Sequence, residues 1–445
     1  MQMVKKILPL LLIICYLNSY ADTIKTDVLV VGGTPSGVSA AIQGSRSKLK
    51  TLLIESSGRL GGKLTESHEN VVRTNANLPS GIWGEFRLRV RDFYKKTPGY
   101  DSTLNAPLKF DGATGAGILK KMTDTVKNLT VKLNTSWTAI KKEGTAWEVT
   151  ITIDGKTDLI KAKVVVDATP DCAVATKAVG VDKLQREITM VADDIDKPYD
   201  RQSKLYRTSI GVADGAGIRP FSIPLGAVVM KNADNLLVTG GKFSNDASIN
   251  DAIADPAVQF TLGQGVGASA AFCAFFKTTT KSLRVRTVQG ELLDFKGYLL
   301  PFSDVNWSDR YFRAYQQIAA TGMLKGIKLG TYRSEEMFMP DTVVNTAEIK
   351  PVLSEVYTRA FIWLNREKPS GLFTVGNLVS LLSEFTLTDP KVMQMTLQKN
   401  WSAQYHFSSV FDTKKPVTRR EFAVLVNKYL NPFARTVDIT GKLIN

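Results

Sequence analysis

A strand, a glycine-rich turn and a helix follow one another near the start of this 445-residue chain. Residues 26–31 (TDVLVV) form a continuous apolar run of strand length, which is typical of a parallel strand buried on both faces. The run ends in residues 32–37 (GGTPSG), and small residues and helix formers follow in 38–45. A second apolar strand, residues 51–54, ends at Glu55. This order predicts the strand–helix–strand unit of a doubly wound α/β fold.

The turn between the first strand and the helix has the chemistry of a dinucleotide site. Gly32 allows a sharp turn off the strand, and Gly37 allows close packing of the helix on the strand. Small residues let backbone N–H groups approach a pyrophosphate at the helix N-terminus, where the helix dipole favours negative charge. Glu55 lies 23 positions after Gly32 and can accept hydrogen bonds from ribose hydroxyls. Thr34 replaces the second glycine of G-x-G-x-x-G, so the flanking elements and the acid carry the prediction.

Residues 57–65 (SGRLGGKLT) come directly after this unit. They resemble the Arg-x-Gly-Gly segment that follows the second strand in FAD-dependent oxidoreductases of the glutathione-reductase-like fold. The resemblance implies that this backbone lies along a flavin diphosphate, which indicates FAD as the cofactor. The cofactor-binding residues predicted in this part of the chain are Gly32, Gly33, Thr34, Pro35, Ser36, Gly37, Glu55, Arg59, Gly61, Gly62, Lys63, Leu64 and Thr65.

Two later segments fit the same fold. Residues 163–168 (KVVVDA) form an apolar strand that resembles the "Ala-Thr-Gly" strand of such enzymes, with Pro170 in place of the glycine. A further apolar stretch, Asn235–Val238 (NLLV), begins the segment 235–241, and Asp255-Pro256 predicts the start of a helix, with an acidic N-cap and proline at the first position. In the family this last helix aims its N-terminal end at the flavin pyrimidine. The resemblance therefore adds three cofactor-binding residues: Gly241, Gly263 and Gln264.

Residues 26–276 as a whole resemble the bacterial FAD-dependent oxidoreductases, some of which are described as xanthan-lyase-related. The flavin-binding component of heterodisulfide reductase is a more distant relative. The segments that carry the resemblance are GGTPSGVSAAI, GRLGGKLT, FSIPLGAVV and LGQGVGASAA. The chain departs from the family pattern at residues 223–226, 240–242 and 245–248, where polar groups are missing. These departures indicate either a different substrate or a fold that has lost catalysis.

The chain contains only three cysteines and two histidines. This count excludes iron–sulfur clusters, Cys/His zinc sites and a disulfide scaffold, and no metal-ligand spacing occurs. No C-x-x-C exists either, so a relay from flavin to disulfide is excluded. Cys172 and Cys273 lie in apolar neighbourhoods, which favours buried thiols, with a disulfide between them as the alternative.

The sequence identifies no catalytic base. His68 follows the glycine pair by six residues and is the one candidate that its position suggests, with a loop histidine as the alternative. His406 is expected to be structural or on the surface. Arg73 and Arg87 could bind an anionic substrate, although solvated surface is the more ordinary place for each.

Residues 1–21 read as a secretory signal. Lys5 and Lys6 precede an apolar stretch at 7–17 that is too short to span a bilayer, and small residues follow at Ser19 and Ala21. We expect an exported protein, periplasmic or associated with the cell envelope, without a transmembrane anchor after cleavage. A retained anchor is the alternative. The net charge is +15, but no basic stripe with interleaved aromatics occurs, so nucleic acid is not an expected partner.

The fold predicted for residues 22–290 is a Rossmann-like, FAD/NAD(P)-binding α/β domain. Segments at about 66–112 and 181–223 are expected to form a smaller cap domain inserted over the flavin. Four aromatic residues of the first segment either line this cap or belong to the core: Trp83, Phe86, Phe93 and Tyr94.

An all-α repeat domain is predicted for residues 297–433, followed by a tail at 434–445. Residues 374–382 and 418–426 share one pattern 44 positions apart, and Thr418 with Glu421 predicts a capping box. The segment 417–423 (VTRREFA) resembles S-layer-homology repeats, in which the arginine, here Arg419, helps to bind cell-wall polysaccharide. Polysaccharide binding and a plain packing or partner role both remain open.

The leading hypothesis is an exported FAD-dependent oxidoreductase that takes hydride from an unknown small molecule. A carbohydrate or an alcohol is the suggested substrate class. The electron acceptor is unknown. The alternative is a non-catalytic envelope or glycan-binding protein that retains a flavin fold.

Overall fold

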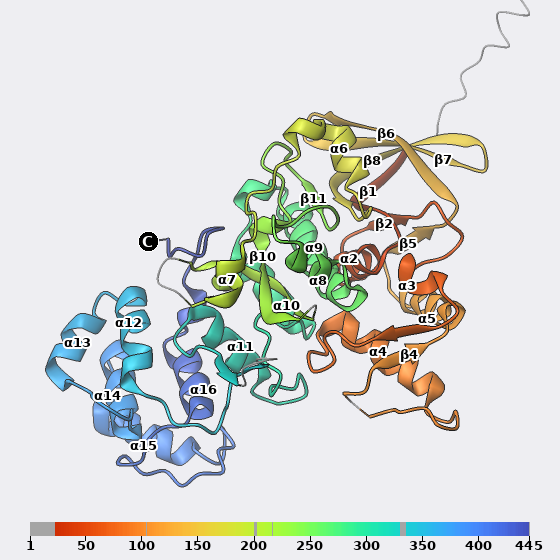
Figure 1. Cartoon of the computed structure of the whole chain (residues 1–445). Helices are drawn as coiled ribbons and strands as arrows, with labels where there is room; N and C mark the ends of the chain where they lie inside the picture. Colours follow the sequence, from red (N-terminus) through yellow and green to blue (C-terminus); the bar gives the residue numbers. More distant parts are fainter. Residues whose placement is uncertain (1–22, 104, 200–202, 216, 330–334, 445) are drawn as a thin grey trace, which may run out of the picture.

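The structure is a computed structural model and describes residues 23–103, 105–199, 203–215, 217–329 and 335–444. The predicted signal at 1–21 lies outside the described residues. A seven-stranded sheet forms the centre of the N-terminal part (Figure 1), with the order β5-β2-β1-β8-β7-β6 and with β11 beside β8. Its strands are β1 (Thr23–Val31), β2 (Thr51–Ile54), β5 (Leu129–Lys132), β6 (Thr135–Glu143), β7 (Ala146–Ile153), β8 (Lys156–Asp167) and β11 (Leu236–Val238).

The sheet is mixed. Strands β5, β2, β1, β8 and β11 run parallel, whereas β6, β7 and β8 form an antiparallel meander. Along β1, Val28 and Val30 belong to the larger hydrophobic cluster of the protein, and Leu29 and Val31 belong to the smaller one on the opposite face. This strand is therefore buried on both faces, as the continuous apolar run predicts.

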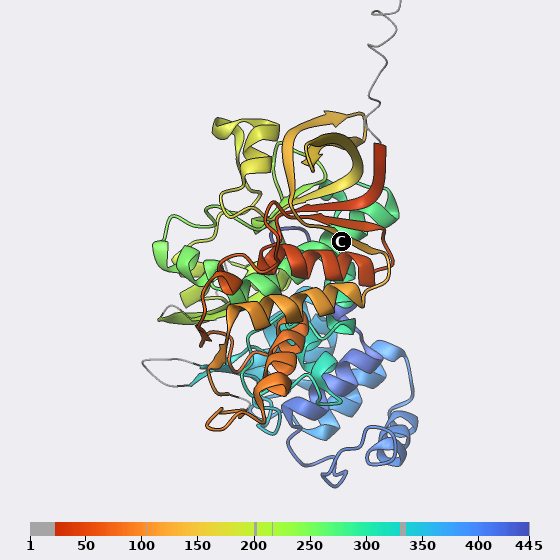
Figure 2. The same ribbon diagram turned by 90° about the vertical axis from the view of Figure 1, so that its right-hand side faces the viewer.

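Helices α2 (Pro35–Arg46) and α9 (Pro256–Phe276) pack side by side on one face of the sheet. Figure 2 shows α2, in red, running below the strands. The contact needs glycine in α9, because a Cβ atom on Gly263 would lie 2.1 Å from the backbone oxygen of Ser36. Asp255 caps α9 by accepting from the N–H of Ala257, and Pro256 opens the helix, as predicted.

The predicted cap segments fold into short elements around α9. The first holds α4 (Gly81–Tyr94) and the strand pair β3 (Asn70–Val72) and β4 (Leu108–Phe110), flanked by α3 (Lys63–Glu66) and α5 (Gly112–Asp124). The second holds α7 (Ala192–Asp196) and the antiparallel pair β9 (Ser209–Gly215) and β10 (Ile218–Pro224). The remaining helices of this part are α6 (Ala173–Val179), α8 (Ala247–Ala254) and α10 (Val285–Asp294).

The aromatic residues of α4 divide between core and surface. Trp83 and Phe86 are buried and contact the ring of Phe260 in α9, with centroid distances of 5.7 and 5.2 Å. Phe93 is exposed and touches Tyr94 edge to face. Trp83 and Phe86 thus fix α4 on α9 as core residues.

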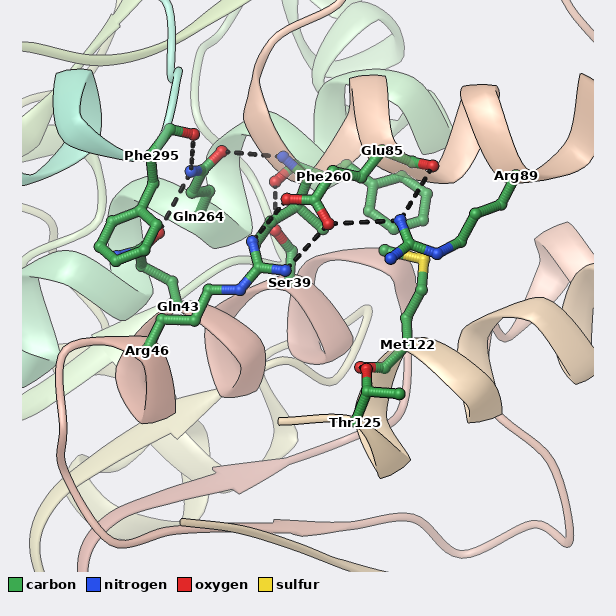
Figure 3. A network of polar contacts seen from close by, with 11 residues as sticks. Ser39, Gln43, Arg46, Glu85, Arg89, Met122, Thr125, Phe260, Gln264 and Phe295 are labelled. Atoms are coloured by element: carbon green, nitrogen blue, oxygen red, sulfur yellow. Dashed lines mark hydrogen bonds and ion pairs between the residues drawn. The ribbon is translucent and has the colours of Figure 1, made fainter. Parts of the chain in front are cut away.

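Polar contacts join α2, α4 and α9 (Figure 3). The Gln264 amide donates to Gln43 Oε1 at 3.1 Å and to the Phe295 oxygen at 3.2 Å, and it accepts from the N–H of Ile82 at 3.2 Å. At the edge of the same contact, Arg46 forms a two-pronged ion pair with Glu85 at 2.6 and 2.9 Å. Gln264 is buried, so its amide satisfies three polar groups that water does not reach.

The C-terminal part is mainly helical and lies below the sheet in Figure 1, in cyan and blue. Two short strands, β12 (Ile327–Leu329) and β13 (Glu335–Met337), pair within it. Its helices are α11 (Phe312–Thr321), α12 (Thr346–Val356), α13 (Ala360–Glu367), α14 (Val375–Thr386), α15 (Pro390–Asn400) and α16 (Arg419–Tyr429).

Three segments of this part close a ring of backbone hydrogen bonds. The N–H of Val344 donates to the oxygen of Val417, Val417 donates to Phe373, and Phe373 donates to Val344, at 2.9, 2.8 and 2.8 Å. All three side chains are fully buried. Each residue is followed by the N-cap of a helix, namely α12, α16 or α14. Thr418 and Glu421 form the predicted capping box, and Thr374 forms a second one.

The helical part and the N-terminal part share one hydrophobic cluster. Arg207 lies just before β9, in the second cap segment. It is buried and forms a two-pronged ion pair with Glu355 of α12, at 2.8 Å for both contacts. The chain end also contacts the N-terminal part, because a Cβ atom on Gly441 would lie 2.0 Å from the Lys204 oxygen. Residues 434–444 therefore fold back across the junction instead of extending from it.

Candidate functional site

A cavity of about 300 Å³ lies where β1, β8 and β11 end, next to the N-termini of α2 and α9. The carboxyl edge of a parallel sheet is where open α/β folds bind their ligands. The lining comes from the turns after these strands, the segment after β2, and helices α8 and α9. Its residues are Thr34, Pro35, Gly62, Lys63, Leu64, Glu66, Ala168, Thr169, Pro170, Thr239, Gly240, Gly241, Phe243, Asn250, Ile253, Ala254, Pro256 and Gln259.

Thr34 connects the first turn to the end of β8. Its hydroxyl accepts from the N–H of Gly37 at 3.2 Å as the N-cap of α2, and it donates to the oxygen of Ala168 at 3.0 Å. Ser36 contacts the hydroxyl of Thr239 at 2.8 Å. A glycine in place of Thr34 would lose both contacts of the hydroxyl. The departure from G-x-G-x-x-G thus has a structural role, since it fixes the turn to the neighbouring strand.

Gly37 is required by the closeness of helix and strand. A Cβ atom at this position would lie 1.9 Å from the Gly32 oxygen and 3.0 Å from the Cβ of Ala168. Gly32 has a φ of +108°, which side chains other than glycine rarely adopt. The turn therefore has the close packing that the sequence predicts, and it brings the N-terminus of α2 to the cavity.

Glu55 lies at the end of β2 beside this turn. Its carboxylate accepts from the backbone N–H groups of Gly33 and Ser57, at 2.5 and 2.7 Å. The residue as a whole is half-buried. This is the place at which an acid can accept from the ribose of a bound nucleotide.

The glycine pair after β2 returns to the first turn. The N–H of Gly61 donates to the oxygen of Gly33 at 2.7 Å, and this contact places Gly62, Lys63 and Leu64 in the cavity lining. Thr65 is buried and donates to the Leu60 oxygen at 2.8 Å, which stabilises the turn from within. The side chain of Arg59 is exposed and does not line the cavity.

The structure gives two predicted residues of α9 another role. Gly263 packs against α2, and Gln264 belongs to the network of Figure 3, so neither lines the cavity. Gln259, more than one helical turn nearer the N-terminus, lines it in their place and donates to the oxygen of Ile253 at 2.7 Å. The helix does direct its N-terminal end to the cavity, whereas Gly263 and Gln264 lie farther along it and outside the lining.

The sequence-based set also lacked residues that follow β11. Gly241 was predicted, whereas Thr239, Gly240, Phe243 and Asn250 were not. Asn250 holds this loop together, since its amide donates to Ser244 and Asp246 oxygens and accepts from the N–H groups of Phe243 and Ser244. Ligands of open α/β sheets bind at the carboxyl ends of the strands, and this rule indicates the residues after β11 as site candidates.

The sequence model of a family described as "FAD dependent oxidoreductase" matches residues 27–187 and 187–292, which is more than half of the chain. The chain belongs to this family. The chain is therefore a FAD-dependent oxidoreductase with a Rossmann-like, glutathione-reductase-like FAD fold, and its cofactor is FAD.

Other known proteins match shorter stretches or match less closely. Mitochondrial dihydrolipoyl dehydrogenase of Dictyostelium discoideum is 26% identical over 165 residues, which are 37% of this chain and 33% of that protein. The chain thus spans about a third of the length of this curated relative. Among solved structures, THI4 of Thermovibrio ammonificans is 15% identical with a TM-score of 0.33, over 61% of this chain and 97% of that one. p-Nitrophenol 4-monooxygenase PnpA of Pseudomonas putida is 16% identical with a TM-score of 0.28, over 38% and 46%.

The residues present fit FAD. Helix α2 offers its N-terminus to a diphosphate, Glu55 offers an acceptor to a ribose, and the turn at Gly61 and Gly62 offers backbone without side chains. The cavity beyond them continues to the N-terminus of α9, whose dipole favours negative charge. When bound, FAD supplies a two-electron acceptor to this family, while the chain supplies binding and orientation.

Arg186 holds the loop that forms one wall of the cavity. Its guanidinium donates to the backbone oxygens of Ala227, Gly240 and Lys242, and it lies 3.9 Å from the centroid of the Phe243 ring. Gly240 and Phe243 both line the cavity, so Arg186 supports this wall from behind. No sequence pattern indicates this role, because the partners of Arg186 come from two distant segments, at 227 and at 240–243.

The other residues considered for chemistry lie elsewhere. His68 and Arg73 are exposed and do not line the cavity. Arg87 is buried, donates to the Ala76 oxygen at 2.5 Å, and has its pKa lowered to about 10 by burial. Cys172 and Cys273 are free and buried, as favoured from the sequence, and burial raises the pKa of each thiol to about 12. Both thiols stay protonated at neutral pH, which makes them poor nucleophiles.

Two glutamines of α9 should separate FAD binding from folding. We expect Gln264→Ala to lower the free energy of unfolding by about 2 kcal/mol, because it leaves buried polar groups without partners, and to leave FAD affinity within about twofold. We expect Gln259→Ala to weaken FAD binding and to change the free energy of unfolding little, because it alters the cavity wall. Urea unfolding and fluorescence titration with FAD measure the two effects. Weaker FAD binding in Gln264→Ala without loss of stability would restore that residue to the cofactor site.

Proposed function

We propose that this FAD-dependent oxidoreductase is exported and takes hydride from an alcohol or a carbohydrate. The observation that carries the proposal is the lining of the FAD cavity, where the only ionisable side chains among the described residues are those of Lys63 and Glu66. The other polar side chains are neutral and suit hydroxyl groups: Thr34, Thr169, Thr239, Asn250 and Gln259. We infer that the part of the lining that a bound flavin leaves free would face the substrate. Neutral donors and acceptors of this kind orient an uncharged polyol without the cost of burying an unpaired charge.

Oxidation of an alcohol removes a hydride from carbon and a proton from the hydroxyl group, leaving a carbonyl. Glu66, at the end of α3, is the one carboxylate that the described part of the chain contributes to the cavity lining. It is exposed to solvent, so we propose it as the acceptor of this proton. His68 remains a prediction, but its side chain lies outside the lining.

If Glu66 accepts the proton, Glu66→Gln should lower kcat by about 100-fold or more while the flavin content stays unchanged. Glu69→Gln is the matched control, since Glu69 is also exposed but does not line the cavity. Stopped-flow reduction of the enzyme by its substrate measures the rate. Equal rates in the Glu66 and Glu69 variants would exclude Glu66 as the base.

The substrate is identified by a panel of sugars and alcohols added without oxygen to the purified enzyme. The proposal expects at least one member to bleach the flavin absorption bands and to be recovered as its carbonyl product. The second candidate, a non-catalytic envelope protein that binds FAD, is supported by the departures from the family pattern at residues 223–226, 240–242 and 245–248. It expects a flavin spectrum that no member of the panel changes.

Export rests on residues 1–21, and the proposed location is the periplasm or the cell envelope. Sequencing the N-terminus of the secreted protein tests it, with Asp22 as the expected first residue. Within the family, the segments given above support a place near the xanthan-lyase-related and heterodisulfide-reductase-like members. The electron acceptor stays open.

We also propose that residues 297–433 are a divergent S-layer-homology-like region. The backbone ring of Val344, Phe373 and Val417, with a capped helix after each, supports a threefold repeat of one unit. A cell-envelope polysaccharide is the partner that this resemblance suggests. Arg419, however, is buried and bonded within the protein, so such a polysaccharide would have to contact other side chains.

A further inference from the structure

Helix α9 is buried over most of its length, but two phenylalanines at its C-terminal end are exposed. Phe275 is 64% exposed and Phe276 is 55% exposed, and their rings lie 5.0 Å apart. Beside them an apolar groove of about 220 Å³ runs between α9, α10 and the end of α2. Its lining also includes Leu49, Phe272 and Val288. Exposed aromatic rings beside a groove mark a contact surface.

Positive charge surrounds this aromatic groove. Lys48 and Lys50 flank Leu49, Lys277 follows Phe276, and Arg284 lies one turn before the α10 residues of the lining; all four are exposed. Within the described part of the chain none of the four forms an ion pair. The one acid of the lining, Glu291, accepts from the hydroxyl of Ser47 at 2.6 Å. The rim is therefore cationic around an apolar centre.

We propose that this aromatic groove docks the protein on an anionic membrane surface. Aromatic rings that insert at the headgroup level and lysines or arginines that meet anionic lipids are the two signals that reversible membrane association needs together. Lysine is depleted from protein–protein interfaces, so the unpaired lysines around this groove favour a membrane over a protein partner. Among the described residues no helix is long and apolar enough to cross a membrane, so docking would be peripheral.

The position of the groove suits this partner. Helix α9 has 21 residues and is thus roughly 30 Å long, with the FAD cavity at its first turn and the groove at its last. Docking would leave the cavity open on the far side.

Vesicle sedimentation tests the proposal with the secreted protein. We expect binding to vesicles of phosphatidylcholine with about 30% phosphatidylglycerol, loss of binding at high salt, and little binding to pure phosphatidylcholine. The double variant F275S/F276S should bind at least about tenfold more weakly. The variant K277Q/R284Q should lose the preference for the anionic lipid. F361S/I362S is the matched control, because these two side chains are equally exposed on α13, and it should bind like the wild type.

Far-UV circular dichroism and FAD content check that each variant is folded. Equal binding of F275S/F276S and wild type would overturn the proposal. So would a lipid-free dimer of the wild type that dissociates in F275S/F276S, because a second copy of the chain would then cover the groove. Light scattering after gel filtration distinguishes this case.

Discussion

Gly37→Ala is expected to yield protein that no longer retains FAD through purification. The added Cβ atom would lie 1.9 Å from the Gly32 oxygen, so either the turn or the N-terminus of α2 must move away from the cavity. Overpacking of this kind costs about 1–3 kcal/mol, which corresponds to a dissociation constant for FAD that is about tenfold to a hundredfold higher. Fluorescence titration of the apoprotein with FAD measures the change.

Gly117→Ala is the matched control. Gly117 lies in α5, and a Cβ atom there would meet no atom within 4 Å. This variant should bind FAD like the wild type and should gain about 0.5–1 kcal/mol of stability, because alanine favours a helix. If Gly37→Ala bound FAD as tightly as Gly117→Ala, the turn at residues 32–37 would not be the diphosphate site.

Arg419→Ala is expected to destabilise the helical part strongly. The guanidinium is buried, donates to the oxygens of Phe338 and Lys325, and pairs with Glu348 at 2.7 Å. Removing it leaves two backbone oxygens and a partly exposed carboxylate without their partner, which costs roughly 2–4 kcal/mol. Thermal unfolding followed by circular dichroism measures the loss.

Arg420→Ala, at the next position, is the comparison. Arg420 pairs with Asp341, whose side chain is 79% exposed, so its loss should cost less than about 1 kcal/mol. A pull-down on cell-wall polysaccharide completes the test. If Arg419→Ala lost polysaccharide binding while it unfolded at the wild-type temperature, Arg419 would be a ligand-binding residue and its internal contacts would carry little stability.

Local chemistry explains why much of the fold can be predicted. Residues 28–31 of the run TDVLVV are all apolar, and their side chains alternate between the two hydrophobic clusters on the two faces of the sheet. Asp255-Pro256 and Thr418 with Glu421 place helix starts correctly, because an N-cap is satisfied by residues two or three positions away. The same holds in part for the first turn. Gly37 is required by the Gly32 oxygen of the same strand–helix unit, whereas a Cβ atom on Gly32 would meet Ala168 at the end of β8.

The parts of the site that sequence reasoning missed depend on contacts across the chain. Gln259 and Gln264 are both glutamines of α9, and only the packing of α2 and α4 decides which of them faces the cavity. Arg186 reaches carbonyls at positions 227, 240 and 242, and no local pattern announces such a cluster. The role of Arg419 was likewise assigned by resemblance, whereas its partners come from segments at 325–348 that lie far away in the sequence.

The absorbance spectrum of the purified protein, with chromatography of the cofactor released by denaturation, shows whether the chain binds FAD. We expect a yellow protein that releases about one FAD per chain and whose apoprotein takes up added FAD. Gly37→Ala prepared in parallel should be colourless. A colourless wild-type protein that is folded and does not bind added FAD would contradict the assignment of the cavity between α2 and α9 as a flavin site.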